Sequence, residues 1–135
     1  MLLQALLSAT LVAAAPPVQL AAGRVTLTGI YNQKGETYLE LVRAVKAALP
    51  GMHVHAFSPL EVLHGATTLG LTTADFLARL RDAGLGTLPG TAAEILDDEV
   101  RALICPDKLD TAQWLGVMRD AHRAGLRSTA TIMFG

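Results

Sequence analysis

Short apolar runs alternate with amphipathic segments along this chain from Arg24 onward. This alternation is typical of successive strand and helix units in an α/β fold. Strands are expected near residues 25–29, 52–57, 85–88 and 127–133, with helices between them. Because a connection between parallel strands of one sheet is almost always right-handed, the sequence predicts about four parallel strands joined by right-handed crossover helices.

Apolar side chains recur at helical spacing in the predicted helices. These helices are expected at residues 38–49, at residues 72–83, after the Pro89–Gly90 turn, and from residue 110 or 111 to residue 124. Capping residues and glycine stops set these limits, such as Thr72 before the second helix and Gly84 after it. The residues expected to face inward are Leu39, Val42, Val45 and Leu49; Phe76, Leu77, Leu80 and Ala83; Ile95, Leu96, Val100 and Leu103; and Trp114, Leu115, Met118 and Ala121.

Residues 1–23 form a separate segment without a charged side chain, and residues 24–135 form the predicted domain. The apolar stretch from Leu2 to Ala15 lacks the basic start of a signal peptide. Two prolines end it before the ~20 apolar residues that a membrane span needs, so a buried or poorly ordered helix is expected there. Four strands are about half of an eight-stranded barrel of about 250 residues, so we expect an incomplete (β/α) barrel, cut at both ends.

The composition narrows the classes of partner. Hydrophobic residues make up 51% and charged residues 17% of the chain, and 11 basic against 12 acidic residues give a net charge of -1. This balance provides no electrostatic attraction for nucleic acid or an anionic membrane. Cys105 is the single cysteine, so this chain alone can form neither an internal disulfide nor a cysteine-ligated metal site. The expected location is a reducing cytoplasm.

Polar side chains at the end of the second predicted strand are candidates for ligand contact, because the carboxyl ends of parallel strands are where α/β proteins hold ligands. Alternation places His53, His55 and Phe57 on one face of this strand, and Val54, Ala56 and Ser58 on the other. The two histidines could bind a metal, hydrogen-bond a ligand, or simply be core residues whose hydrogen bonds are made within the protein. No third metal ligand is evident in the sequence.

The turn after the third predicted strand combines backbone N–H groups, the Thr91 hydroxyl and the Glu94 carboxylate. Such a turn can hold a ribose hydroxyl or an amino group of a ligand. Equally, Thr91 could cap the following helix with Glu94 at its third position, an arrangement that needs no ligand. The acidic run at residues 97–99 is expected to be a solvated helix face, because it has no neighbouring histidine or calcium-type loop.

Four long phrases carry a resemblance to a known family. They are HVHAFSPLEV at 53–62, AGLGTLPGTAAEILDDEVR at 83–101, ICPDKLDTAQW at 104–114 and AHRAGLRSTATIMFG at 121–135. From about Tyr38 onward the chain resembles radical S-adenosylmethionine enzymes of deazaflavin biosynthesis, specifically the second subunit or carboxy-terminal half of FO synthase. The related futalosine-processing enzymes of the menaquinone pathway share the HAFSP and AEIL phrases. Their sequence is closer to PGGGAE at the position where this chain has PGTAAE. This difference favours the deazaflavin branch.

The resemblance implies a radical S-adenosylmethionine type of barrel, with S-adenosylmethionine and a [4Fe-4S] cluster as cofactors. It implies tyrosine and 5-amino-6-(D-ribitylamino)uracil as substrates in the formation of FO, the chromophore of coenzyme F-420. The first FO synthase subunit or domain is an implied partner. Residues implied to contact S-adenosylmethionine are Thr91, Glu94 and Gly29, and those implied to contact substrate are His55, Ser58, Thr129, Thr131 and Met133.

The chain departs from the family pattern in its cluster ligands. The Cys-x-x-x-Cys-x-x-Cys motif is absent, Cys105 lies in a different phrase, and the family's Gln-Gly-Gly phrase is replaced by Thr28-Gly29-Ile30. The sequence therefore predicts part of an FO synthase-like enzyme that is inactive alone. The menaquinone-branch enzyme and a non-catalytic nucleoside-binding remnant remain the alternatives.

Overall fold

The computed structural model describes residues 19–21, 24–26 and 33–134 of the chain. The elements in these ranges are, in chain order, β1 (Gln19–Ala21), β2 (Arg24–Thr26), α1 (Gly35–Ala48), α2 (Pro59–Thr68), α3 (Thr73–Ala83), β3 (Thr87–Leu88), α4 (Asp98–Ile104), α5 (Thr111–Arg123) and β4 (Arg127–Ser128). None of the helices in the described ranges has the length and apolar character needed to cross a membrane.

Three of the predicted strand regions are parallel neighbours. β3 pairs with β4 in the parallel direction, with Thr87 opposite Arg127. A parallel bridge joins His55 to Thr87, and another joins Glu94 to Ile132. The regions near residues 55, 87 and 127 therefore lie side by side in that order. Their parallel direction is the predicted one, although the regular ladder is shorter than expected. The closure of a barrel and the hand of the crossovers stay predictions.

The first predicted strand pairs differently from the expectation. Arg24–Thr26 forms β2, and β2 pairs antiparallel with β1 at Gln19–Ala21. The remainder of the predicted strand, with Gly29, lies outside the described residues. This hairpin also joins the two predicted segments across their boundary at residues 23 and 24. A hairpin of this length depends on backbone hydrogen bonds, so the side-chain pattern gave no sign of β1.

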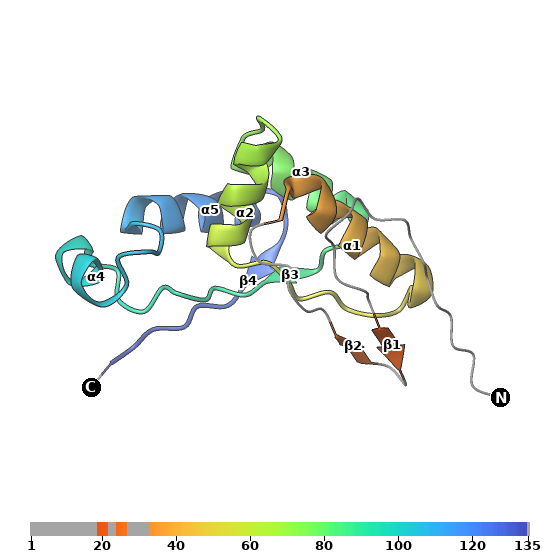
Figure 1. The fold of residues 1–135 in the computed structure, drawn as a ribbon, viewed down its shortest axis with the longest axis horizontal. Coiled ribbons are helices and arrows are strands. Elements are labelled where there is room, and N and C mark those ends of the chain that lie inside the picture. The colour runs from red at the N-terminus through yellow and green to blue at the C-terminus, as the bar shows by residue number, and fades with distance from the viewer. Residues whose placement is uncertain (1–18, 22–23, 27–32, 135) are drawn as a thin grey trace.

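The helices pack on one side of the parallel strands, where the core lies. Figure 1 shows α1, α2, α3 and α5 on the same side of β3 and β4. The ring of Tyr38 on α1 meets that of Phe57 at a centroid distance of 4.9 Å. Other fully buried side chains are Leu39, Leu41, Val42, Val62, Phe76, Leu77, Leu80 and Leu88. Thus the opposite side of these strands is left for polar residues.

Three predicted helices are confirmed as α1, α3 and α5. Thr72 caps α3 by accepting a hydrogen bond from the Asp75 N–H, and Gly84 ends it with a φ of 112°. Asp110 and Gln113 form a capping box at the start of α5. The expected inward residues of these helices are buried or partly buried except Leu115, which is 40% exposed. Capping chemistry and helical spacing therefore identified these elements correctly.

Helix α2 was not predicted, although its start carries a clear signal. Ser58 and Glu61 form a reciprocal capping box, and Pro59 occupies the first turn, where its missing N–H costs no hydrogen bond. Gly65 lets α2 approach its neighbours, because a Cβ there would lie 2.7 Å from the ring of Phe76. As a result α2 packs against both α1 and α3.

The prediction for α4 was wrong in both its start and its buried face. The helix begins only at Asp98, because the Asp97 carboxylate accepts hydrogen bonds from the N–H groups of Glu99 and Val100. Val100 is 37% exposed and Leu103 is 83% exposed, although both were expected to face inward. The residue that this register buries is Arg101, which is 3% exposed. The acidic side chains at 97–99 are exposed, as expected.

Candidate functional site

The exposed side of the parallel strands carries a cluster of polar side chains. His53 Nε2 lies 2.8 Å from the Thr87 hydroxyl oxygen, and His55 Nδ1 lies 2.8 Å from the same oxygen. Gly86 makes room for this arrangement, because a Cβ there would lie 2.4 Å from the His53 ring. Both imidazoles therefore sit on the face of the strands that is opposite the helices.

Phe57 does not share this face, contrary to the expected alternation. Its φ of 67° lies in the left-handed region, and its ring is buried in the core beside Tyr38. The backbone reversal at Phe57 breaks the period-2 pattern two residues before α2 begins. Ser58, a predicted substrate contact, is used in the fold: its hydroxyl donates to a Glu61 carboxylate oxygen at 2.7 Å.

The predicted site residues after β3 and β4 are brought together by backbone hydrogen bonds. Gly90 N–H donates to the Thr129 hydroxyl at 3.0 Å, and Thr131 N–H donates to the Gly90 carbonyl at 2.9 Å. Glu94 N–H then donates to the Thr131 carbonyl at 3.0 Å, and Met133 N–H donates to the Glu94 carbonyl at 2.7 Å. These contacts hold Glu94, Thr129, Thr131 and Met133 along one edge of the structure.

The Thr91–Ile95 loop has an unusual backbone. Ala92 has a φ of 57° and Glu94 a φ of 48°, and each left-handed residue of this kind costs roughly 1–3 kcal/mol. Thr91 and Glu94 thus stand in a loop ahead of α4, which Asp97 caps, so the capping-box interpretation of these two residues was wrong. Strained residues of this type concentrate at ligand sites, where surrounding contacts hold them in place.

Arg101 and Trp114 are the supporting residues that the sequence did not identify. The Arg101 guanidinium donates to the carbonyl oxygens of Ala93 at 2.6 Å, Ile95 at 3.0 Å and Ala92 at 3.2 Å, and also to Leu109. Trp114 Nε1 donates to the Thr91 carbonyl at 3.1 Å. With the Met133 contact, every carbonyl of the Thr91–Ile95 loop is hydrogen-bonded.

Side-chain groups of this loop stay available for a ligand. In the part of the chain that the structure describes, no hydrogen-bond partner is present for the Glu94 carboxylate or for the Thr91 and Thr131 hydroxyls. A nucleoside offers hydroxyl and amino donors to a carboxylate, and ring nitrogens to a hydroxyl. By chemical type, the carboxylate and the two hydroxyls therefore match the polar groups that a nucleoside presents.

The [4Fe-4S] cluster that the resemblance implies is a different case, because the chain lacks the cysteines to ligate it. Cys105 is buried at the end of α4, and no other cysteine exists in the chain. Among the described residues, no group of three or more histidine, cysteine, aspartate or glutamate side chains could hold a metal ion. An iron–sulfur cluster takes about three or four thiolates, so the residues present do not fit it.

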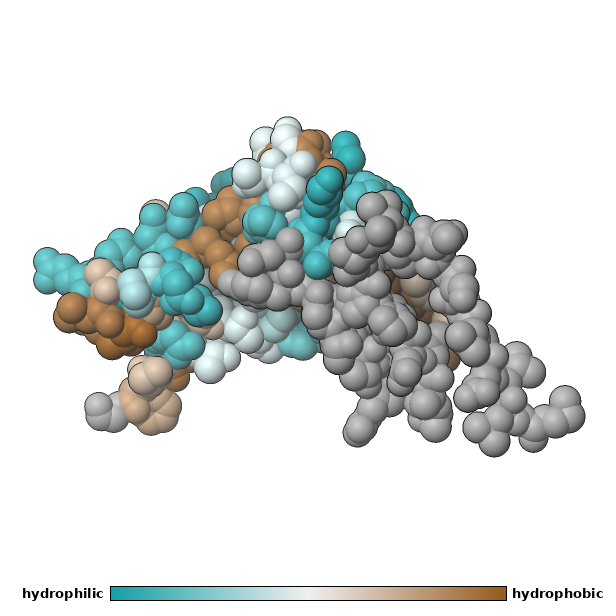
Figure 2. Space-filling model, in the orientation of Figure 1, coloured by the Kyte–Doolittle hydropathy of each residue, from teal (hydrophilic) through white to brown (hydrophobic). Residues whose placement is uncertain are grey.

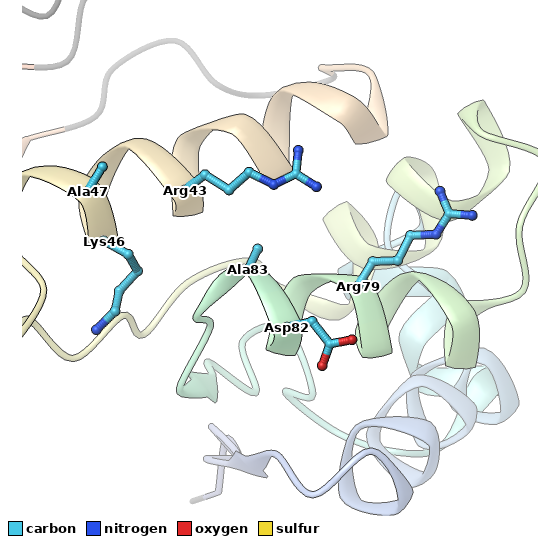
Figure 3. A pocket seen from close by; sticks show the side chains of 6 residues that line it. All are labelled: Arg43, Lys46, Ala47, Arg79, Asp82 and Ala83. Atoms are coloured by element: carbon cyan, nitrogen blue, oxygen red, sulfur yellow. The ribbon is translucent and has the colours of Figure 1, made fainter.

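A cavity of about 480 Å³ lies on the outer surface between α1 and α3. Figure 3 shows side chains that line it, among them Arg43 and Lys46 on α1 and Arg79 and Asp82 on α3. Lys46 is already engaged, since its Nζ donates to the carbonyls of Pro50 at 2.6 Å and Met52 at 2.8 Å. Arg43 pairs with Glu36. This cavity is separate from the strand ends, so the candidate site stays with the polar face and the loop.

Comparison with known proteins identifies relatives over most of the chain. No family model matches it. The 5-amino-6-(D-ribitylamino)uracil–L-tyrosine 4-hydroxyphenyl transferase of Archaeoglobus fulgidus is 54% identical over 98 residues, and that of Methanothermobacter thermautotrophicus is 53% identical over 98 residues. The FO synthase of Mycobacterium tuberculosis is 56% identical over 98 residues. In each case the match covers 73% of this chain.

The chain is much shorter than these relatives. The matched region is 29% of the Archaeoglobus protein, 27% of the Methanothermobacter protein and 11% of the Mycobacterium protein. Identity of this level over 98 residues confirms the resemblance that the four sequence phrases indicated.

Proposed function

We propose that this chain supplies part of the ligand-binding face of an FO synthase-like enzyme. The reason is that 98 of its residues are homologous to FO synthases and to 5-amino-6-(D-ribitylamino)uracil–L-tyrosine 4-hydroxyphenyl transferases. The observation that carries the proposal is the identity of 53–56% across that segment. The substrates follow from the names of these relatives: L-tyrosine, and the aminouracil that receives its 4-hydroxyphenyl group.

The residues have distinct roles in this proposal. Glu94, with the hydroxyls of Thr91 and Thr131, binds the nucleoside part of S-adenosylmethionine. The face with His55 and Thr129 orients the substrates, and Met133 shields them from water. S-Adenosylmethionine is the family's source of a 5′-deoxyadenosyl radical. No catalytic step is assigned to this chain alone, since its single cysteine cannot ligate the cluster.

Two other functions are considered as alternatives, and the experiments below distinguish them from the proposed one. The names of the relatives favour the deazaflavin branch over the menaquinone branch. A nucleoside-binding protein without catalysis is the second candidate, because the chain has one cysteine. It would bind S-adenosylmethionine with the same residues but would not contribute to product formation.

The test measures binding of S-adenosylmethionine by calorimetry to the full chain and to a Glu94→Gln variant. Loss of the carboxylate is expected to weaken binding by about tenfold or more, the effect of removing a charged hydrogen-bond partner. Glu99→Gln is the matched control, because Glu99 is exposed on α4 and lies outside the site. Equal binding by the wild-type and Glu94→Gln chains would reject the assigned role, and no binding by the wild type would reject the site.

A complementation experiment separates an enzyme part from a binding protein. The chain is mixed anaerobically with a cluster-bearing segment of an FO synthase that lacks the matched region. Tyrosine, the aminouracil and a reductant are then added. Formation of FO precursor only when the chain is present would support the proposal. Binding without any rescue would favour the nucleoside-binding alternative.

A further inference from the structure

We propose that Arg101 is the positioning residue of this site: it fixes the Thr91–Ile95 loop in its left-handed conformation and thereby aims Glu94 at the ligand. The inference rests on the proposed function in so far as Glu94 binds a nucleoside. It concerns a residue that lies beneath the loop and touches no ligand. Sequence pattern alone gave Arg101 no role.

The first support is the set of carbonyls that Arg101 holds. Its Nη1 donates to Ala93 and Ile95, its Nη2 donates to Ala92 and Leu109, and its Nε donates to Leu109. Three of these carbonyls belong to the loop, and they flank both left-handed residues, Ala92 and Glu94. A planar guanidinium matches this spread of acceptors, whereas an ammonium group is a point donor.

The second support is that Arg101 is a buried charged side chain whose hydrogen-bond partners are neutral. Arg101 is 3% exposed, yet the hydrogen-bond acceptors of its guanidinium in the described part of the chain are neutral carbonyl oxygens. Ion pairs elsewhere in the described ranges join Arg43 to Glu36, Arg81 to Asp82 and Lys108 to Asp107. A buried charge is costly without compensation, so the carbonyl dipoles of the loop are organised around it. Collapse of the loop would remove three of its acceptors, the carbonyls of Ala92, Ala93 and Ile95, and leave only the Leu109 carbonyl.

The third support is the direct link between the loop and the neighbouring strand. Glu94 both donates to Thr131 and accepts from Met133 through its backbone. A change in the backbone conformation of Glu94 would disturb both hydrogen bonds and redirect its carboxylate. Arg101 therefore acts on two loop-to-strand contacts and on the direction of one ligand-binding side chain.

The test combines amide hydrogen exchange with ligand affinity in the full chain. Arg101→Met and Arg101→Lys variants are expected to lose protection at the Glu94 and Met133 amides. Protection should be retained at the Thr129 amide, which directly follows β4 and donates to the Leu88 carbonyl of β3. Affinity for S-adenosylmethionine should fall by about tenfold to a hundredfold, the usual effect of removing a supporting residue. Arg79→Met, on the outer face of α3, is the matched control and should behave as wild type.

Each other result has a defined meaning. Native loop protection and native affinity in either Arg101 variant would overturn the proposal. If Arg101→Met unfolds, Arg101→Lys decides: selective loss at the loop supports positioning, whereas unfolding of this variant too would show a purely structural role and overturn it. If the wild type binds no S-adenosylmethionine, the proposed function fails, and the exchange pattern still decides whether Arg101 fixes the loop.

Discussion

Gly90 and Thr129 are in such close contact that a Cβ on Gly90 would lie 1.7 Å from the Thr129 carbonyl oxygen. The same two residues are joined by the hydrogen bond from the Gly90 N–H to the Thr129 hydroxyl. This contact lies where the β3 and β4 chains leave the regular ladder and enter the candidate site. The absence of a side chain at Gly90 therefore sets the distance between the two halves of the site.

Substitution of Gly90 by alanine is expected to destabilise the fold by about 2–3 kcal/mol, because the methyl group would meet backbone atoms that cannot turn aside. Urea unfolding measures this change. Gly116→Ala is the control, since nothing lies within 4 Å of its Cβ position. Alanine is the better helix former within α5, so this variant should be more stable by about 0.5–1 kcal/mol. Equal stability of Gly90→Ala and wild type would contradict the close packing.

Asp98 gives a prediction about pH. Thr111 lowers the pKa of the Asp98 carboxyl, through its side chain first and its backbone N–H second, and the charge of Arg101 adds a smaller effect. The N–H contact, at 2.8 Å, is the firmer of the two, because the Thr111 hydroxyl has no partner at hydrogen-bond geometry among the described residues. The folded state thus favours the carboxylate.

A lowered pKa in the folded state contributes stability above the unfolded value, and this stability is lost as the pH falls through the folded value. Asp98→Asn should therefore flatten the dependence of unfolding free energy on pH below about pH 4. Urea titrations at several pH values measure the slope. Carbon NMR of the Asp98 carboxyl should show a lower pKa in the folded chain than in urea. The reverse order of these two values would refute the assignment.

Periodicity and capping chemistry predicted much of this fold. The inward residues of α1 and α3, such as Leu39 and Phe76, were found by their spacing, and the parallel strand regions by their apolar runs. These signals are local, so one sequence is enough to detect them. The Ser58–Glu61 capping box is an equally local signal, and it marks the start of α2, the helix that was not predicted.

The parts that escaped prediction depend on tertiary contacts. The left-handed backbone of Phe57, Ala92 and Glu94 has no signal in residue type, because glycine is the usual occupant of that region. The burial of Arg101 in α4 was not predicted, because arginine is rarely fully buried. The candidate site residues were proposed from strand-end chemistry and from the resemblance, whereas the contacts that hold the loop became visible only in the structure.

The cofactor chemistry of the isolated chain follows from its one cysteine. After anaerobic reconstitution with iron and sulfide, the chain is expected to show no charge-transfer absorption of a [4Fe-4S] centre, which takes about three or four thiolate ligands. It should also release no 5′-deoxyadenosine from S-adenosylmethionine in the presence of dithionite. A full-length FO synthase treated in the same way is the positive control. Stoichiometric 5′-deoxyadenosine from the chain alone would reject this prediction.

Self-association is expected from two exposed features of the structure. In the described residues β4 pairs with β3 on one edge only, and its other edge is open to another strand. Large apolar side chains are also exposed on α4, where Leu103 is 83% and Ile104 51% exposed, and at the end of the chain, where Phe134 is 95% exposed. Figure 2 shows apolar residues gathered over α4 at one end of the molecule. Exposed apolar patches of this kind favour association.

Light scattering of the chain at increasing concentration should therefore show a mass that rises above that of a monomer. Replacing Leu103 and Ile104 with lysine should lower this mass at a given concentration, because the charges oppose burial of the α4 surface. Ala102→Lys is the matched control, since Ala102 is exposed on the same helix without a large apolar side chain. Co-expression with the remaining barrel segments of an FO synthase should raise the soluble yield. A constant monomer mass together with a cooperative thermal transition would show instead that the chain is self-sufficient, and would favour the nucleoside-binding alternative.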